Sequence, residues 1–422
     1  MTSSNKLKYY GEEVEEDFLY NCVGEGWHPI LKQLFEDLFA IGWDGDVHQV
    51  KEKFGCYDEE TRVLTKDGFK YFKEVSYDDE IATLKEGRYL EYNKPSDIIS
   101  YHYEGDMYRL KTRGVDLLVT PNHNLYVAKG SYYNGRYSPP KRVDYDFELT
   151  TYQKYLGKNK RFLKGCEWIG KEKENFILPK MSISWNNISN SLREKSWKEK
   201  VIPMNKWLQL LGWYVAEGSS CRDAQATFSV CYLDEKNELP IISEIIESCG
   251  FKPNFNEENS GSAINIKVYE KRLAKWLLEN CGHLAPNKKV PSFIKELSGD
   301  QIKIFLESLF QGDGCKQNTS HILSTTSKRL CDDVCELILK CGDTFSFWSR
   351  EPRQTELANG VHKVYEINWL KSSNDHNTSN KGMAKSSIEQ VETYSGNVYC
   401  VTVPNNVIFI ERGGKGVWCG NS

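Results

Sequence analysis

The middle of the chain contains the same pattern of helices and strands twice, and this repeat limits the possible folds more than any other feature. Each copy predicts a helix, a strand, a second helix and a second strand. The first copy spans 205–269 and the second spans 301–370. The second helices end in the similar segments IIESCGFKPNF and LILKCGDTFSF. Two copies of one α/β unit predict a domain with pseudo-twofold symmetry.

Short β-like runs lie on both sides of this repeat. Lys66-Asp67-Gly68 separates two alternating runs, and Asp-Gly in that position is a hairpin signal. Further upstream runs occur at 107–113, 115–120 and 124–128, and the β pattern returns at 397–421 after the polar loop 372–385. The sequence therefore predicts an all-β module into which an α/β domain is inserted.

The composition is that of a soluble globular chain with several cores. It has 422 residues, of which 39% are hydrophobic, and no run approaches the roughly 20 uncharged residues of a membrane span. The thirteen cysteines are scattered and lack the spacing of a zinc site or a disulfide framework. We therefore expect a cytoplasmic protein with packed thiols and no membrane partner.

Charge is distributed unevenly along the chain. Residues 1–55 hold 5 basic and 11 acidic side chains, whereas 129–206 holds 17 basic and 8 acidic ones. Aromatic residues are interleaved with this basic stretch: Tyr152, Tyr155, Trp168 and Trp197. Such a stretch is typical of a nucleic-acid contact surface, because phosphate neutralisation supplies most non-specific affinity. A solvated basic linker is the open alternative.

Four segments of the β flanks carry reactive side chains. They are CYDEETRVLTKDGFKYFKEV from Cys56, GVDLLVTPNHNLYV, GNVYCVTVPNNVIFI, and GGKGVWCGNS at the end. Together they bracket 56–421 and resemble the intein family, whose fold is the horseshoe-shaped, mainly β Hint module. The resemblance implies that 56–421 excises itself from a host protein and joins Gly55 to Ser422.

The resemblance implies roles for three residues at the upstream junction. Cys56 would attack the carbonyl of Gly55 and form a thioester, because a thiol is a good nucleophile and a good leaving group. His123, in the family's Thr-x-x-His motif, would be the acid that protonates the departing nitrogen. Thr120 or a nearby backbone amide would hold the scissile carbonyl.

The downstream junction matches the family less completely. Cys400 lies where many members have Asp or Cys, and would assist proton transfer. Ser422 would attack the thioester, and Asn421 would then cyclise onto its own carbonyl, with no cofactor needed. Asn406 and Gly420 stand where family members commonly have His. We therefore expect Asn421 cyclisation to be the slow step.

The first helix of each repeat copy carries a second resemblance. LLGWYVAEG at 210–218 and LESLFQGDG at 306–314 resemble the two motifs of the LAGLIDADG homing endonucleases. Small residues occupy matching positions in the two helices: Gly212 with Ser308, and Ala216 with Gly312. These positions predict close helix packing, which would bring the two acidic residues at the helix ends together.

Those acidic residues are Glu217 and Asp313, which would bind Mg²⁺ or Mn²⁺ for phosphodiester cleavage. Lys288 in KKVPSFI fits the family's Lys-x-hydrophobic-Pro element and would stabilise the phosphate charge or orient water. For the second half, Lys371 and Lys381 are both candidates for the equivalent lysine. The implied partner is double-stranded DNA of the host gene without the insertion.

DNA recognition in this family uses β-sheet faces in the major groove. The corresponding strands here would be 226–234, 263–269, 321–327 and 363–370. Candidate contact residues on or near them are Lys267, Arg350, Arg353 and Lys363. We expect the protein to act on DNA as a monomer.

These inferences divide the chain into six parts. They are an N-extein with short α/β patterns at 1–55, the first Hint part at 56–130, a basic linker or DNA-contacting region at 131–204, an α+β LAGLIDADG domain at 205–375, the second Hint part at 383–421, and the first C-extein residue, 422. The exteins would be joined in cis.

Two alternatives remain. One is a Hint domain that cleaves itself without ligation, and the Asn421-Ser422 pair favours splicing over it. The other is a DNA-binding endonuclease with an inactive splicing module. Cys56 together with Thr120 and His123 favours splicing over that alternative.

Overall fold

The computed structural model describes residues 6–9, 12–15, 55–130, 145–186, 192–221, 225–231, 238–257, 263–317, 320–351, 362–371, 375–378 and 388–421. In the N-terminal part, β1 (Lys6–Tyr9) pairs with β2 (Glu12–Glu15). The helical part of the α/β pattern predicted at 1–55 lies outside the described residues. Among the described helices, none is both long and apolar enough to span a membrane.

Strands from both ends of the chain combine in the β flanks. The upstream strands are β3 (Arg62–Thr65), β4 (Gly68–Tyr71), β5 (Ile81–Lys85), β6 (Tyr89–Asn93), β7 (Asp97–Lys111), β8 (Asp116–Val119) and β9 (Asn124–Lys129), with a 3₁₀ helix η1 (Phe72–Glu74). The downstream strands are β25 (Ile388–Thr402), β26 (Val407–Arg412) and β27 (Lys415–Gly420). The predicted hairpin is confirmed, since Thr65 pairs with Gly68. Strand β25 pairs with β7, and β26 pairs with β3 and β5.

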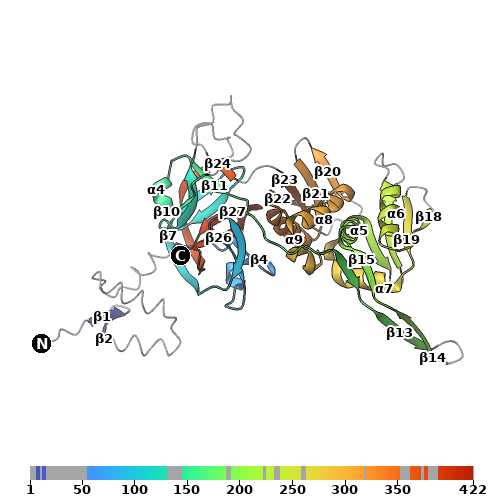
Figure 1. The fold of residues 1–422 in the computed structure, drawn as a ribbon. Coiled ribbons are helices and arrows are strands. Elements are labelled where there is room, and N and C mark those ends of the chain that lie inside the picture. Colours follow the sequence, from blue (N-terminus) through green and yellow to red (C-terminus); the bar gives the residue numbers. More distant parts are fainter. Residues whose placement is uncertain are drawn as a thin grey trace.

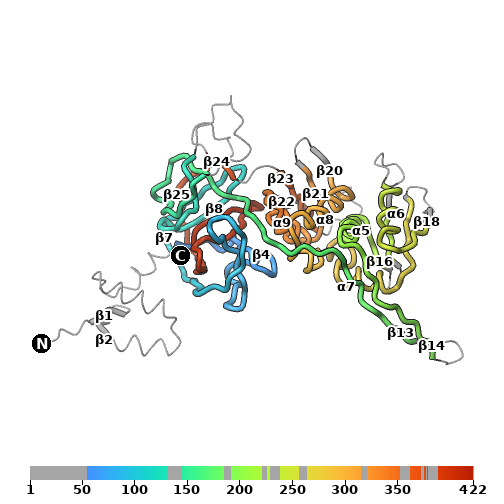
Figure 2. Tube along the Cα trace, viewed as in Figure 1, coloured from blue at the N-terminus to red at the C-terminus, as the bar shows by residue number. Residues whose placement is uncertain are grey.

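Part of the basic stretch lies beside these strands. A sheet of order β10-β9-β11-β24 includes β10 (Glu148–Thr151), β11 (Lys160–Leu163) and β24 (Asp375–Thr378), and α4 (Tyr152–Tyr155) follows β10. Next come β12 (Asn175–Leu178), β13 (Met181–Asn186), β14 (Leu192–Trp197) and β15 (Lys200–Pro203). Pairs β12–β15 and β13–β14 share one register, so they form one ribbon, which extends away from α7 in Figure 2.

The predicted α/β repeat is confirmed. Its first copy has α5 (Met204–Glu217), β16 (Gly218–Cys221), β17 (Gln225–Cys231), α6 (Glu238–Ser248), β18 (Asn254–Glu257) and β19 (Ala263–Val268). Then follow α7 (Lys271–Cys281), η2 (Ala285–Asn287) and η3 (Ser292–Glu296). The second copy has α8 (Gly299–Gly312), β20 (Gly314–Gln317), β21 (Ser320–Thr325), α9 (Lys328–Lys340), β22 (Thr344–Arg350) and β23 (Val364–Leu370). The strand orders β16-β17-β19-β18 and β20-β21-β23-β22 match (Figure 1).

Local capping explains where two of these helices begin. The Ser298 hydroxyl accepts a hydrogen bond from the Gln301 backbone at the start of α8. The Ser327 hydroxyl does the same for the Leu330 backbone at the start of α9. Serine at these positions satisfies one of the backbone N–H groups that a helix leaves unpaired at its N-terminus.

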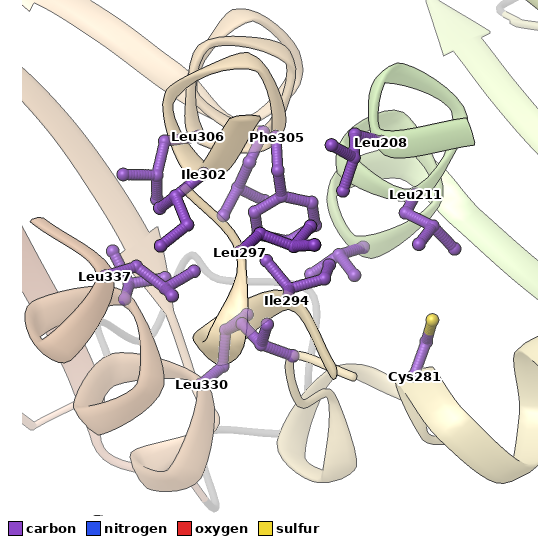
Figure 3. Close-up of a cluster of buried hydrophobic side chains, with 14 of the residues drawn as sticks. Leu208, Leu211, Cys281, Ile294, Leu297, Ile302, Phe305, Leu306, Leu330 and Leu337 are labelled. Carbon is purple, nitrogen blue, oxygen red and sulfur yellow. The ribbon is translucent and has the colours of Figure 1, made fainter. Parts of the chain in front are cut away.

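The repeat and the flanks share both a sheet and an apolar core. Strand β22 pairs with β27, so the second repeat sheet continues into the flank as a ten-stranded sheet. Buried side chains of α5, α8 and α9 meet in one cluster, with Leu211, Phe305 and Leu337 among them (Figure 3). That cluster also contains Leu64 and Trp418 from the flanks. The structure is therefore a mixed α+β fold in which the two parts are packed together.

Candidate functional site

The segment Gly55-Cys56-Tyr57 is held between β8 and β25. The Tyr57 N–H donates to the Tyr399 carbonyl at 2.8 Å, and the Tyr399 N–H donates back to Tyr57 at 2.9 Å. The Cys56 N–H donates to Thr120 Oγ1 at 2.8 Å, and the Thr120 N–H donates to the Cys56 carbonyl at 3.0 Å. Thr120 therefore contacts the nitrogen of the Gly55–Cys56 peptide bond, where the sequence predicted contact with its carbonyl.

The thiol of Cys56 is completely buried. Burial raises its pKa well above the usual value, and the nearby thiol of Cys400 raises it further. A hydrogen bond with the Tyr101 hydroxyl acts in the opposite direction. The thiol is therefore protonated at neutral pH, and β7 and β25 supply its polar neighbours. Sequence patterns did not single out Tyr101, because nothing local marks a strand residue that contacts a thiol far away in the chain.

The imidazole of His123 is buried beside the same peptide bond. A Cβ added to Gly55 would lie 2.5 Å from the His123 Cα, so this position requires glycine. The Tyr57 ring packs edge-on against the imidazole at 4.3 Å between centroids, and Cys419 Sγ lies 3.5 Å from Nε2. Burial lowers the pKa of His123 to about 4, although a hydrogen bond with the Gly55 backbone opposes this shift. The ring is therefore neutral at pH 7.

Strand β27 brings Asn421 to this site. The Asn421 side chain is buried, and the Asn421 backbone N–H donates to the Asn406 carbonyl at 3.1 Å. The Tyr57 hydroxyl donates to the Gly420 carbonyl. Within the described residues, neither side-chain atom of the Asn421 amide has a hydrogen-bond partner. The Asn421 amide, which the sequence predicts to be a nucleophile, is thus not held by competing hydrogen bonds among the described residues. Ser422 lies outside the described residues.

Gly420 and Asn406 stand where members of the intein family commonly have histidine, and the backbone at both positions is restricted. A Cβ on Gly420 would lie 2.3 Å from the Asn124 carbonyl oxygen, so a side chain at 420 requires the strand to move. Asn406 has a φ of 55°, a left-handed conformation that Asn tolerates better than most residues. Its N–H donates to Val403 at 3.1 Å in the turn before β26. Backbone packing therefore disfavours histidine at 420, whereas the left-handed conformation at 406 is one that histidine also adopts.

At the second candidate site, α5 and α8 cross at their small residues. A Cβ on Gly212 would lie 2.6 Å from the Ser308 Cβ, and a Cβ on Gly312 would lie 2.6 Å from the Ala216 Cβ. These are the two pairs that the sequence predicted. Larger side chains would separate the helices at this crossing.

The acidic residues and Lys288 gather at the ends of these helices. Glu217 is the last residue of α5, and Asp313 follows α8. Lys288 Nζ donates to the carbonyls of Tyr214 at 2.7 Å and Gly218 at 2.6 Å. Burial lowers the pKa of Lys288 to about 8, while Asp313 and Glu217 oppose that shift. All three predicted residues therefore lie near one another, with Lys288 bonded to the backbone.

The chemistry of this donor set fits a small divalent cation. Asp313 is exposed and Glu217 is half-buried, so both carboxylates can be reached from solvent. No group of three or more His, Cys, Asp or Glu suited to a metal occurs in the described parts of the chain. Two carboxylates suffice for Mg²⁺, which usually completes its coordination with waters and substrate phosphates.

The other predicted DNA-site residues are spread over the second repeat and β19. Lys371 Nζ lies 3.5 Å from Glu307 and stacks over the Trp369 ring at 4.1 Å. Arg350 is paired with Glu366 at 2.7 Å. Lys267 is half-buried in β19 and Lys363 is exposed before β23. Lys381 and Arg353 lie outside the described residues.

Comparison with known proteins places these features in context. No protein-family model matches the chain. It is 27% identical over 431 residues to the DNA-directed RNA polymerase subunit beta C-terminal section of Stigeoclonium helveticum, covering 89% of this chain and 37% of that protein. It is 26% identical over 478 residues to the ATP-dependent Clp protease proteolytic subunit of Chlamydomonas moewusii, covering 87% and 45%. The chain thus spans less than half the length of these two relatives.

Solved structures match only parts of the chain. I-DmoI in complex with DNA and Mn has a TM-score of 0.29 and 12% identity, covering 39% of this chain and 89% of that one. The AceL NrdHF class 3 split intein has a TM-score of 0.19 and 16% identity, covering 35% and 74%. In its junction motifs and its paired helices, the chain resembles an intein with an inserted LAGLIDADG homing endonuclease domain.

Proposed function

We propose that 56–421 is a self-splicing intein and that its inserted α/β repeat is a site-specific DNA endonuclease. One observation carries the splicing proposal. The Gly55–Cys56 peptide and Asn421 lie in the same buried site, where the Tyr57 hydroxyl bonds to Gly420 across 363 positions of sequence. The paired strands around this site are compatible with the Hint horseshoe.

The first step transfers an acyl group within the upstream junction. Cys56 Sγ forms a bond to the Gly55 carbonyl carbon, the carbon–nitrogen bond breaks, and the thiol proton is in effect moved to the departing nitrogen. Thr120 Oγ1 already holds that nitrogen at 2.8 Å. His123 faces the same peptide bond and is the proposed proton donor, with Cys400 assisting proton transfer.

The later steps release the segment and join its flanks. The Ser422 hydroxyl attacks the Gly55 thioester and returns Cys56 to a thiol. The Asn421 side-chain nitrogen then bonds to its own carbonyl carbon and breaks the peptide bond to Ser422. The freed Ser422 amine finally takes the acyl group from its own oxygen, which leaves a Gly55–Ser422 peptide bond.

Splicing is tested by expressing the chain with a reporter after Ser422 and analysing the products by mass spectrometry. We expect a ligated Gly55–Ser422 product and an excised fragment spanning 56–421. Cys56→Ala combined with Asn421→Ala should abolish both. Only intact precursor from the parent chain would refute splicing. Separated flanks without a ligated product would instead support the self-cleaving alternative.

For the endonuclease, the convergence of Glu217 and Asp313 at the crossed helices is the supporting observation. These carboxylates would hold Mg²⁺ or Mn²⁺, which when bound stabilises charge on the attacked phosphate. Lys288, beside both, would orient water or stabilise the phosphate charge. I-DmoI was solved in complex with DNA and Mn. We propose double-stranded DNA of the uninterrupted host gene as the substrate.

This activity is tested by incubating the purified chain with Mg²⁺ and host-gene DNA that lacks the insertion. A double-strand cut is expected, and Asp313→Ala should remove it. Asp300→Ala is the matched control, because Asp300 is exposed at the opposite end of α8. Equal cutting by both variants would contradict the proposed site. A cut without splicing would support the endonuclease with an inactive splicing module.

A further inference from the structure

Cys419 is a buried side chain to which the splicing steps above assign no role. It lies on β27, two residues before Asn421, and its Sγ is 3.5 Å from Nε2 of His123. Another acceptor, the Asn124 carbonyl, is farther away at 3.8 Å. The imidazole nitrogen is therefore the nearer of these two acceptors for the Cys419 thiol hydrogen. The Tyr57 hydroxyl also contacts the thiol, but it donates its own hydrogen to the Gly420 carbonyl.

The other ring nitrogen, Nδ1, is the one nearer the His123 Cα, against which Gly55 packs. Nδ1 makes no well-formed hydrogen bond within the described residues. The Gly55 backbone nevertheless raises the pKa of His123 against the effect of burial. Only an acceptor has this effect on a base, and in glycine that acceptor is the carbonyl oxygen. Since Cys419 Sγ lies beside Nε2 and Gly55 packs against the His123 Cα, we place the Gly55 carbonyl on the Nδ1 side of the ring.

These contacts distinguish the two neutral forms of the ring. With its hydrogen on Nδ1, the ring offers a donor to the Gly55 carbonyl and an acceptor to the thiol. With its hydrogen on Nε2, the ring would donate to sulfur, which is a weak acceptor. The lone pair of Nδ1 would then face a lone pair of the Gly55 carbonyl oxygen, which is unfavourable. Because the pKa of His123 is about 4, the ring is neutral at pH 7 and can donate only from the nitrogen that bears the hydrogen.

We propose that the Cys419 thiol donates to Nε2 of His123 and thereby keeps the ring hydrogen on Nδ1, facing the Gly55–Cys56 peptide bond. Cys419 is thus a positioning residue for the upstream step. Because Cys419 lies on β27, which ends at Gly420 immediately before Asn421, the upstream junction becomes reactive only when β27 is in place. The kinetic part of this inference rests on the proposed splicing function, whereas the hydrogen position does not.

The hydrogen position can be measured without any activity. Chain 1–422 with Cys56→Ala and Asn421→Ala, labelled with ¹⁵N-histidine, is examined by NMR, and His123→Gln assigns the His123 signal. We expect the hydrogen on Nδ1 in this chain and partly or wholly on Nε2 after Cys419→Val. Cys249→Val is the matched control, because Cys249 is an equally buried thiol of the first repeat. The proposal would be overturned if the hydrogen were on Nε2 in the starting chain, or if Cys419→Val left the hydrogen position unchanged.

The consequence is measured as cleavage of the Gly55–Cys56 bond in chain 1–422 by dithiothreitol. Loss of the correct ring form should slow this cleavage about 10- to 100-fold in Cys419→Val. Cys419→Ser keeps a hydrogen donor and should recover part of the rate, whereas Cys249→Val should match the parent. Equal rates in Cys419→Val and the parent would contradict the positioning role. No cleavage in the parent would instead count against the splicing function, and the NMR result would still stand.

Discussion

At the scale of single residues, Tyr57 connects the two junctions. Its backbone pairs with Tyr399, its ring packs against His123, and its hydroxyl donates to the Gly420 carbonyl. The residue next to Cys56 therefore also holds the strand that leads to Asn421. Gly420 has no side chain that could hold this strand itself. A side chain there would overlap the Asn124 backbone.

Removing this hydroxyl should affect the downstream junction selectively. Tyr57→Phe leaves the buried Gly420 carbonyl without its donor, at a cost of about 1–3 kcal/mol. We expect release at Asn421 to slow about tenfold relative to cleavage at Gly55, measured as the ratio of the two products over time. Tyr92→Phe, which removes a hydroxyl bonded to Glu336, is the control and should leave the ratio unchanged.

Thr120 should matter for the upstream step. Thr120→Val keeps the shape but removes the acceptor of the Cys56 N–H, so cleavage at Gly55 should slow about 10-fold or more. The measurement is the dithiothreitol cleavage rate. Thr83→Val removes a similarly buried hydroxyl that donates to Val407 at 2.5 Å. If both variants slowed cleavage equally, Thr120 would have only a structural role.

Burial of His123 predicts a loss of stability in acid. Its pKa is lowered to about 4 in the folded chain against an ordinary value of 6.5, so the unfolded chain binds more protons between these pH values. The stability is fully present above pH 6.5 and falls by roughly 3 kcal/mol as the pH approaches 4. The free energy of unfolding in urea is measured for the parent and for His123→Gln across this pH range. The difference between their pH dependences gives the part of the acid destabilisation that is due to His123. His376, whose pKa is also lowered to about 4, contributes in the same direction, so His376→Gln is measured alongside.

At the scale of elements, the contact between α5 and α8 determines where the carboxylates lie. The helices meet at Gly212 with Ser308 and at Ala216 with Gly312, and both turn into strands immediately afterwards. Small side chains permit this close approach, and without it the two helix ends would separate. A change at the crossing should therefore alter both stability and DNA cleavage.

Gly312→Val tests this contact. Its Cβ would lie 2.6 Å from the Ala216 Cβ, so the helices must shift, which costs about 1–3 kcal/mol. We expect lower stability in urea unfolding together with loss of Mg²⁺-dependent cutting. Gln311→Val introduces the same side chain at an exposed position of α8, where it meets no clash. Similar behaviour of the two variants would show that the crossing tolerates larger side chains.

At the scale of the whole molecule, the two candidate activities share one framework. The sheet that contains β22 continues through β27 to β3, and β27 leads directly to Asn421. Arg62 on β3 bridges the parts, donating to Glu411 at 2.6 Å and to Asp332 on α9 at 2.9 Å. The repeat therefore supports the strand that forms the downstream junction.

Breaking this bridge should destabilise the whole chain. Asp332→Ala leaves the buried Arg62 with Glu411 only, and we expect a loss of about 2–3 kcal/mol in the free energy of unfolding. Tryptophan fluorescence should still report one transition, because the larger of the two apolar clusters contains side chains of both parts. Asp78→Ala, which removes an exposed partner of Lys94, should change stability by less than about 0.5 kcal/mol. Two separate transitions in the parent would contradict a shared core.

Local sequence patterns predicted a large part of this molecule. Periodicity located the repeat, the Asp67-Gly68 turn located the first hairpin, and small residues predicted the helix crossing, because each depends on side chains close together in sequence. Cys56, His123 and Asn421 came instead from the resemblance of their motifs to the intein family. The roles of these residues and the domain boundaries remain predictions.

Only the tertiary structure decided how these parts meet. It turned Thr120 toward the nitrogen of the Gly55–Cys56 bond, added Tyr57, Tyr101 and Cys419 to the site, and joined the repeat to the flanks through β22 and β27. These contacts join residues that are often hundreds of positions apart, and their pairing depends on strand register and shared burial. Neither property leaves a pattern in the neighbouring sequence.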